Sequence, residues 1–394
     1  MITNERVRRP ISDRELERRW AAAREVLQEK GIDMMFVQGS NLHLGGYVRW
    51  FTDIPGEYNY NMTVMFPVDD EMTIVRSCAF PVPEWALRGV KEIKYAPFCP
   101  TLNYTAESEI GLIVDYIRHR NPAKVGYAGK AFIHTSLMLA LLKTFPEVEF
   151  VDITNEIDLL KALKSDEEME CMRATARIHD AAWDALPAIV KPGMTEYQIR
   201  AEFVQLLTNM GSEEHLMFHG TAPQNTPCGM PTFQYQNRTL KEGDYGVLLM
   251  EVSGPGGYYC ESARNYSLGE PCKKLADAYQ VCIDAQKLTA DLLTPGRPAI
   301  EIVREYNKYV DKLGYCQEGR LYGHSQGYDL IERPACMRDD DRGVEDMIVM
   351  EGMCISLHPY LTDEFQTTYV NDNFYVTKNG AERIHKSSQE LIIL

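Results

Sequence analysis

The feature that most constrains the fold is a repeat in the second half of the chain. Similar residues recur at an offset of 103 positions, from Pro192-Gly193 to Pro295-Gly296 (192 to 295). Further matched pairs are Ile199 and Ile302, Phe203 and Tyr306, Leu207 and Val310, and Gly211 and Gly314. Two related units in one domain predict a pseudo-two-fold arrangement, with a site where strands from both units converge.

An apolar run that ends on a glutamate lies in the first unit. Val247–Met250 leads into Glu251, a turn rich in Gly and Pro follows, and Tyr258 and Glu261 come next. This pattern predicts a β-hairpin with two carboxylates. A glutamate at the end of an apolar strand is costly to bury without a partner or a task. The alternative is an exposed strand end or an ion pair with Arg264.

Length and composition predict a two-domain cytoplasmic protein. The chain has 394 residues, 45% of them hydrophobic and 25% charged. Its formal charge of −16 argues against a nucleic-acid partner, which would require a cluster of Lys and Arg. No apolar run has the length of a signal peptide or a membrane span. Ten cysteines without a C-x-x-C spacing indicate reduced thiols.

Residues 1–155 predict an α/β amino-terminal domain. Ser12 and Glu15 form a capping-box pattern ahead of a helix from about Asp13 to Lys30, and strands alternate with helices after it. The predicted strands are Met34–Val37, Met62–Phe66, Met72–Val75 and Lys124–Tyr127, and the predicted helices lie near Glu107–Arg118 and Phe132–Thr144.

An aromatic segment lies between the first two predicted strands. It contains Arg49, Trp50, Phe51, Tyr58 and Tyr60. The aromatics either pack on their own domain or form a lid over another site. If they remain partly exposed, they favour a homodimer in which the segment is covered.

Residues 156–394 predict an α+β domain that contains the repeat. Its second unit offers His324 after a Gly-containing turn, His358 on an apolar strand, and Asn371 on another strand. Two glutamates and two histidines from separate segments suit metal binding or general acid–base chemistry. The alternative is that each histidine is a hydrogen-bonded core or loop residue.

These motifs, in their order along the chain, resemble the pita-bread enzymes, which include methionine and proline aminopeptidases, prolidase, creatinase and ectoine hydrolase. The matching phrases are KSDEEMECMRATA, NRTLKEGD, GHSQG, EGMCISLHP and VTKNG. The resemblance implies an α/β amino-terminal domain (1–155) and a pita-bread catalytic domain (156–394).

The resemblance also implies the positions of five metal ligands, and this chain alters most of them. Metal-dependent members hold two divalent ions with two aspartates, a histidine and two glutamates. Here Glu251 and Glu261 occupy the aspartate positions, His324 keeps the histidine, and His358 and Asn371 replace the glutamates. We therefore expect the dinuclear centre to be lost and no cofactor to be needed.

These departures make the chain similar to the metal-independent creatinase and ectoine hydrolase branch. The resemblance implies a hydrolase that cleaves a C–N bond in a small amidine, guanidino or cyclic amide compound with a carboxylate. Glu251 would be nucleophile or base, His324 and His358 would move the proton, and Glu261 would hold a cationic nitrogen.

Four further residues are candidates for substrate binding. Arg333, in the region where creatinase holds its substrate carboxylate, or Arg49 would bind the carboxylate as a bidentate fork. Asn371 and Tyr258 lie at the same predicted site. Creatinase-like relatives complete each site with the partner's amino-terminal domain, which implies a homodimer in which Arg49 acts across the interface.

Two alternatives stay open. The first is a metal-dependent hydrolase of the Xaa-Pro dipeptidase type, or a lyase on the same fold, with one Zn, Fe or Mn ion on Glu261, His324 and His358. The second is a non-catalytic pita-bread domain that binds peptides or proteins. Turnover of a small substrate separates the second alternative from the enzymes.

Overall fold

The computed structural model describes residues 11–39, 43–56, 60–77, 82–83, 86–97, 99, 102–337 and 347–394. The chain divides into two compact units with the boundary between Lys161 and Ala162. The predicted boundary after residue 155 falls inside α6 (Thr154–Ala162), a few residues earlier. Within the described residues, no helix combines the length and the apolar character that a membrane span requires.

The amino-terminal unit contains a six-stranded sheet in the order β4-β3-β2-β1-β5-β6. Strand β1 is antiparallel to β2 and parallel to β5. The strands are β1 (Met34–Gly39), β2 (Met62–Pro67), β3 (Met72–Arg76), β4 (Val90–Tyr95), β5 (Lys124–Ala128) and β6 (Glu149–Asp152). The helices are α2 (Asp13–Glu29), α3 (Tyr47–Thr52), η2 (Asn103–Thr105), α4 (Ala106–Arg120), α5 (Thr135–Thr144) and α6.

The sequence missed both edge strands of this sheet. β4 reads VKEIKY and β6 reads EFVD, and every residue of both is at least partly exposed. Charged residues on edge strands prevent pairing with other chains, but they also remove the apolar alternation from which strands are predicted.

The aromatic segment packs on its own unit. Trp50 and Phe51 are buried in α3, the Trp20 indole N–H donates to the Phe51 carbonyl (2.8 Å), and the Arg19 guanidinium lies over the Trp50 ring. These two rings therefore provide no exposed aromatic surface. Tyr58 lies outside the described residues. The homodimer stays a prediction, but the rings of Trp50 and Phe51 no longer support it.

The carboxy-terminal unit contains the repeat as two matching helices. Helix α8 (Glu196–Asn209) and helix α10 (Ala299–Lys312) begin and end at the predicted offset of 103 residues (196 to 299, 209 to 312). Each follows a Pro-Gly turn whose glycine has positive φ, 89° at Gly193 and 90° at Gly296, a conformation that favours glycine. The internal repeat predicted from sequence is thus confirmed.

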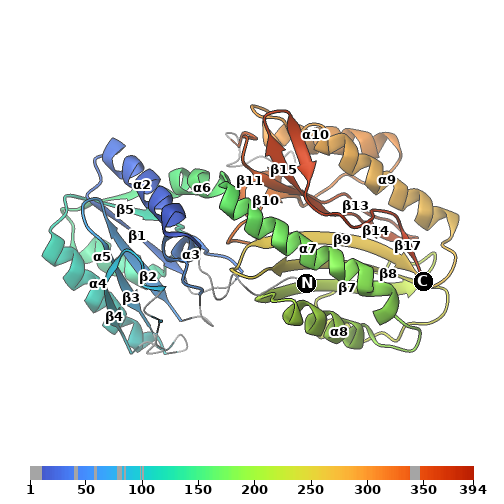
Figure 1. Cartoon of the computed structure of the whole chain (residues 1–394), viewed down its shortest axis with the longest axis horizontal. Helices are drawn as coiled ribbons and strands as arrows, with labels where there is room; N and C mark the ends of the chain where they lie inside the picture. Colours follow the sequence, from blue (N-terminus) through green and yellow to red (C-terminus); the bar gives the residue numbers. More distant parts are fainter. Residues whose placement is uncertain are drawn as a thin grey trace. The chain divides into compact units, whose positions relative to one another are not determined.

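Each half of this unit places helices on one face of a sheet (Figure 1). Helices α7 (Asp166–Ile189) and α8 pack on a sheet of order β17-β9-β8-β7, and α9 (Lys273–Ala290) and α10 pack on a sheet of order β11-β10-β12-β15-β16. The first sheet contains β7 (Glu214–Pro223), β8 (Asp244–Ser253), β9 (Tyr259–Ser267) and β17 (Ile392–Ile393). The second contains β10 (Leu321–Ser325), β11 (Glu332–Met337), β12 (Cys354–Leu357), β15 (Asp372–Thr377) and β16 (Gly380–Arg383). Short elements are η3 (Phe233–Tyr235), β13 (Tyr360–Thr362) and β14 (Thr367–Tyr369).

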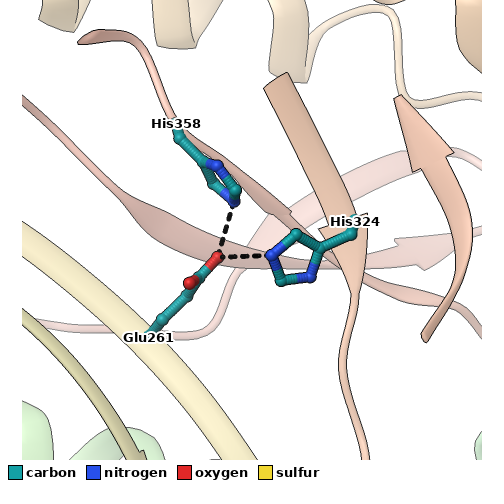
Figure 2. A group of neighbouring side chains, drawn as sticks. All are labelled: Glu261, His324 and His358. Atoms are coloured by element: carbon teal, nitrogen blue, oxygen red, sulfur yellow. Dashed lines mark ion pairs between the residues drawn. The ribbon is translucent and has the colours of Figure 1, made fainter. Parts of the chain in front are cut away.

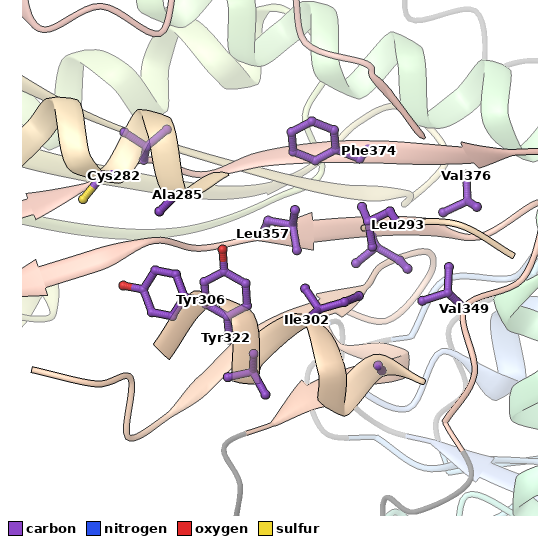
Figure 3. Packing of buried hydrophobic residues seen from close by; sticks show 14 of the residues in the cluster. Cys282, Ala285, Leu293, Ile302, Tyr306, Tyr322, Val349, Leu357, Phe374 and Val376 are labelled. Carbon is purple, nitrogen blue, oxygen red and sulfur yellow. The ribbon is translucent and has the colours of Figure 1, made fainter. Parts of the chain in front are cut away.

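The hydrophobic core beneath α9 and α10 holds the strand that leads to His358. Ile302 and Tyr306 of α10 share a buried cluster with Leu357, the last residue of β12 (Figure 3). Burial of a side chain of this size contributes about 1.5–3 kcal/mol. This packing holds β12 in place, and His358 follows directly from it.

Candidate metal centre

The structure brings Glu261, His324 and His358 together inside the carboxy-terminal unit (Figure 2). Glu261 Oε1 lies 2.7 Å from His358 Nε2 and 3.5 Å from His324 Nε2. All three residues are buried, and one potential ligand atom from each lies within 4.8 Å of the others. Among the described residues, these three form the group with the geometry of a metal site.

A row of residues across three strands faces Glu261. His324 on β10 is directly opposite Ser356 on β12, and Ser356 is directly opposite Asn373 on β15. Directly opposite residues project to the same face of a sheet. Ser356 Oγ contacts Glu261 Oε1, and Asn373 Oδ1 accepts the Glu261 backbone N–H (2.9 Å).

The two halves of the repeat meet beside this row. Strand β9 carries Glu261, and its Ala263 forms an antiparallel bridge with Asn371, which directly precedes β15. Arg264 on β9 donates to the Asn371 carbonyl (2.9 Å) and to the Asp372 carboxylate (2.7 Å). The carboxylate from the first half and the histidines from the second half are therefore joined by backbone pairing.

Glu251 lies directly opposite Glu261 on the neighbouring strand β8. Desolvation and the adjacent charge of Glu261 raise the pKa of the Glu251 carboxyl well above its usual range. Burial opposes ionisation of Glu261, but His358 and His324 outweigh it and hold the pKa of Glu261 well below its usual range. The pKa values of the two carboxyl groups are thus shifted in opposite directions, so a proton shared by the pair favours Glu251, which is half-buried.

The His324 ring is oriented as a ligand. Its Nδ1 lies 3.0 Å from the Ser325 carbonyl, which only accepts hydrogen bonds, so Nδ1 carries the proton. Burial lowers the pKa of His324 to about 4, so the ring is neutral at neutral pH. The lone pair is then on Nε2, the nitrogen that faces Glu261. Metal-binding histidines usually donate a hydrogen bond from their other ring nitrogen, as Nδ1 does here.

The buried polar atoms of the triad fit one cation. Within the part of the chain that the structure describes, Glu261 Oε2 and His358 Nε2 are buried without a hydrogen-bond partner, and His358 Nε2 lies 2.7 Å from the other carboxylate oxygen, Glu261 Oε1. Unpartnered buried polar atoms are costly, and a divalent ion satisfies a carboxylate and two imidazoles together.

The same residues do not fit two ions. The resemblance to the metal-dependent enzymes implies that Asn371 stands where a carboxylate would bridge two ions, but its amide has one oxygen, and that oxygen lies 2.8 Å from Ser356 Oγ. A neutral amide adds no negative charge to offset a second dication.

The remaining predicted site residues have different environments. Tyr258 is buried, packs against Tyr328 in a tilted arrangement (4.2 Å between ring centroids), and donates to Glu168 (3.2 Å). Arg333 is half-buried on β11, the strand that pairs with the His324 strand. Arg49 lies in α3 of the other compact unit. Their roles in substrate binding stay predictions.

The sequence analysis missed Ser356, Asn373 and Gln326. Gln326 Oε1 accepts a hydrogen bond from Asn373 Nδ2 (2.7 Å). A signal for the first two was present, since Ser356 precedes His358 by two positions and Asn373 follows Asn371 by two. Residues two apart on a strand share a face.

Comparison with known proteins identifies the family. The profile described as "Metallopeptidase family M24" matches residues 170–378, more than half of the chain. The chain belongs to metallopeptidase family M24. It is therefore a member of a family of peptide hydrolases, and the expected relationship to the pita-bread enzymes is confirmed.

Several relatives match over most of their length. "Probable dipeptidase PepE" of Mycobacterium tuberculosis is 25% identical over 310 residues, covering 74% of this chain and 80% of that protein. "Xaa-Pro dipeptidase" of Lactobacillus delbrueckii subsp. lactis is 25% identical over 394 residues, covering 93% and 96%. The crystal structure of X-Pro aminopeptidase from Thermotoga maritima matches with a TM-score of 0.80 at 16% identity, covering 95% and 99%. The structural match confirms the fold.

The expectation that no cofactor is needed is wrong. The chain belongs to a family of metallopeptidases, and Glu261, His324 and His358 form a candidate metal-binding group. The family's carboxylate set is altered at two positions, which favoured a metal-free site from sequence, with a single ion on Glu261, His324 and His358 as the alternative. The structure brings these same three residues together, so the alternative is the better supported of the two.

Proposed function

We propose that this protein is a metal-dependent hydrolase of peptide C–N bonds, of the Xaa-Pro dipeptidase type, with a single divalent ion. The triad of Glu261, His324 and His358 carries the proposal because two imidazoles and one carboxylate suit Zn²⁺, Fe²⁺ or Mn²⁺. The names of relatives support the substrate class, since they include a probable dipeptidase and an Xaa-Pro dipeptidase.

The proposed ligands are Glu261 and the Nε2 atoms of His324 and His358. A divalent ion at this position supplies Lewis acidity toward a carbonyl group. Ser325 holds the proton of His324 on Nδ1 and so keeps Nε2 free for the ion. Ser356 contacts Glu261 Oε1 and limits the orientations of that carboxylate.

Glu251 is the proposed proton-transfer residue. Its carboxyl group lies opposite the Glu261 ligand on β8 and is more exposed than Glu261. Proton transfer by a placed side chain contributes about 10²–10⁴-fold to a rate. Glu251 therefore has a catalytic task even though it is outside the metal-binding group.

Arg333 and Arg49 are the proposed carboxylate-binding residues, and Asn371 and Tyr258 are proposed substrate contacts. We also propose a cytoplasmic homodimer in which Arg49 acts across the interface. Free thiols such as the exposed Cys316 are compatible with a reducing compartment. Light scattering that reports a monomer at micromolar concentration would exclude the dimer and the cross-interface role of Arg49.

The decisive experiment combines metal analysis with an assay. Protein dialysed against a chelator is reloaded with Zn²⁺, Mn²⁺, Fe²⁺ or Co²⁺ and tested on Xaa-Pro dipeptides and on guanidino and cyclic amide compounds. We expect one ion per chain. We also expect that hydrolysis of an Xaa-Pro dipeptide stops when the ion is removed and resumes when it is added back. Two ions per chain, or full activity of metal-free protein, would overturn the proposal.

A further inference from the structure

We infer that Asn373 and Gln326 are positioning residues that fix the distance between the carboxylate ligand Glu261 and the imidazole ligand His324. The inference rests on the proposed single-ion site. Neither residue is proposed as a ligand. Asn373 hydrogen-bonds to the backbone of Glu261, and Gln326 lies two residues after His324.

The Asn373 side chain links three segments of the carboxy-terminal unit. Its Oδ1 accepts the Glu261 backbone N–H (2.9 Å) and lies 3.1 Å from His385 Nε2, and its Nδ2 donates to Gln326 Oε1 (2.7 Å). Glu261, Asn373, Gln326 and His385 are all buried, with exposures of 0, 0, 0 and 1%. Water therefore does not compete for these bonds.

Backbone groups at both ends determine the direction of this chain of amides. Gln326 Nε2 donates to the Leu330 carbonyl (3.1 Å), which only accepts, so Gln326 Oε1 must face Asn373. The Asn373 Nδ2 then faces Gln326, and its Oδ1 faces the Glu261 N–H, which only donates. Reversing either amide would set two donors or two acceptors against each other.

The hydrogen-bonded amides of Asn373 and Gln326 connect the two sides of the metal centre. Gln326 follows His324 by two residues, and its own N–H donates to the Cys354 carbonyl on β12 (3.1 Å). At the other end, the bond to the Glu261 N–H holds the backbone from which the carboxylate projects. Asn373 and Gln326 thus connect the strand of one ligand to the loop that follows the other.

The physical requirement is positional accuracy. Ligand atoms must lie within about 0.2 Å of the distances that an ion demands, and groups behind the ligands typically account for 10–100-fold in metal affinity. Uncharged amides also suit this place, because a carboxylate at position 373 would add a charge beside the ionised Glu261 in a buried site.

The test measures Co²⁺ affinity and the Co²⁺ absorption spectrum of the full chain, without an activity assay. Asn373→Ala removes the bonds to Glu261 and Gln326 and the contact with His385, and Gln326→Met removes the acceptor of Asn373 while leaving the bond to Glu261. We expect each variant to bind Co²⁺ about 10–100-fold more weakly than wild type, with a changed spectrum. The double variant should lose less Co²⁺ affinity than the product of the two single-variant losses, since Asn373 and Gln326 act through the same hydrogen bond.

The matched control is Asn265→Ala. Asn265 is buried on the same strand as Glu261, donates to the Thr367 carbonyl (2.9 Å) and accepts the Tyr369 N–H (2.8 Å), and neither of these bonds reaches one of the three ligands. It should lower the unfolding temperature and leave Co²⁺ affinity within about threefold of wild type, as expected for a purely structural residue.

The outcomes separate this inference from the proposed function. Wild-type protein that binds no Co²⁺ would contradict the single-ion site itself. Wild-type binding with unchanged affinity in Asn373→Ala, or equal losses in Asn373→Ala and Asn265→Ala, would overturn the positioning role alone. If Asn373→Ala does not fold, Gln326→Met decides, and wild-type affinity in that variant would contradict the inference.

Discussion

Glu261 Oε1 lies 2.7 Å from His358 Nε2, although the two residues belong to different halves of the internal repeat. Glu261 is on the hairpin of the first half, and His358 follows the strand that α10 packs against in the second. The bridge between Ala263 and Asn371 pairs the halves next to this contact. The candidate metal centre therefore exists only when both halves are folded and joined.

Removing the charge of Glu261 should abolish tight metal binding. We expect Glu261→Gln to weaken Co²⁺ binding by more than about 100-fold. This loss is larger than the loss expected for substitution of residues that only hydrogen-bond to a ligand. Isothermal titration gives the affinity, and Glu270→Gln, at an exposed glutamate after β9, is the control. A Glu261→Gln protein that binds Co²⁺ as wild type does would show that Glu261 is not a ligand.

Glu251→Gln should separate metal binding from turnover. The amide keeps the volume of the protonated carboxyl but cannot transfer a proton, so we expect kcat to fall by about 10²–10⁴-fold with metal affinity within about threefold of wild type. Metal titration and steady-state kinetics with an Xaa-Pro dipeptide measure the two effects. A kcat above about a tenth of wild type would exclude proton transfer by Glu251.

Asp372→Asn should strongly destabilise the fold. Burial opposes ionisation of Asp372, but Arg264 and Arg383 outweigh it and hold its pKa at about 2. Arg264 and Asp372 are both fully buried, so the substitution leaves a buried guanidinium uncompensated and should cost about 3–5 kcal/mol.

Urea denaturation measures the free energy of unfolding of this variant. Asp277→Asn is the control, because Asp277 pairs with Lys273 on the surface and should change the free energy of unfolding by no measurable amount. Equal stability of the two variants would refute the structural role of the buried pair.

Metal-free protein should lose stability in mild acid, in part through His219. Burial lowers the pKa of His219 from 6.5 to about 4, and the titratable group in contact with the ring is the Tyr266 hydroxyl (2.8 Å). Between these pH values the unfolded chain binds a proton that the folded chain does not. Stability is therefore complete above about pH 6.5 and falls by about 1.4 kcal/mol per pH unit per histidine as pH decreases toward 4.

Denaturant unfolding at several pH values measures this slope. His219→Gln should make the slope shallower by about 1.4 kcal/mol per pH unit between pH 6 and pH 4.5, because one such histidine is removed. An unchanged slope would mean that His219 does not remain neutral in the folded chain.

The sequence by itself determined the repeat, the family and the segments that bear the site. Backbone rules explain this success, since Pro-Gly turns, capping residues and helical periodicity act over a few residues and reappeared as α8 and α10 with the predicted offset. The sequence also named Glu261, His324 and His358 as the ligand set in case a metal is bound.

Local rules failed where neighbours came from elsewhere in the chain. The sequence left open whether Trp50 and Phe51 pack on their own domain or form a lid. Arg19 and Trp20 of α2 contact them, and this contact has no local signal in the sequence.

Only the tertiary structure decided that the altered ligand set still forms a metal-binding group. From sequence, His358 was either the replacement of a lost carboxylate in a metal-free site or the third ligand of a single ion, and sequence positions contain no distances that could decide between the two. The register of β10, β12 and β15 places His324, Ser356 and Asn373 in one row against Glu261, and the pairing of β9 with the residue before β15 brings His358 to the same carboxylate. Coordination depends on distances of a few ångströms between residues far apart in sequence, and those are fixed by strand register and core packing.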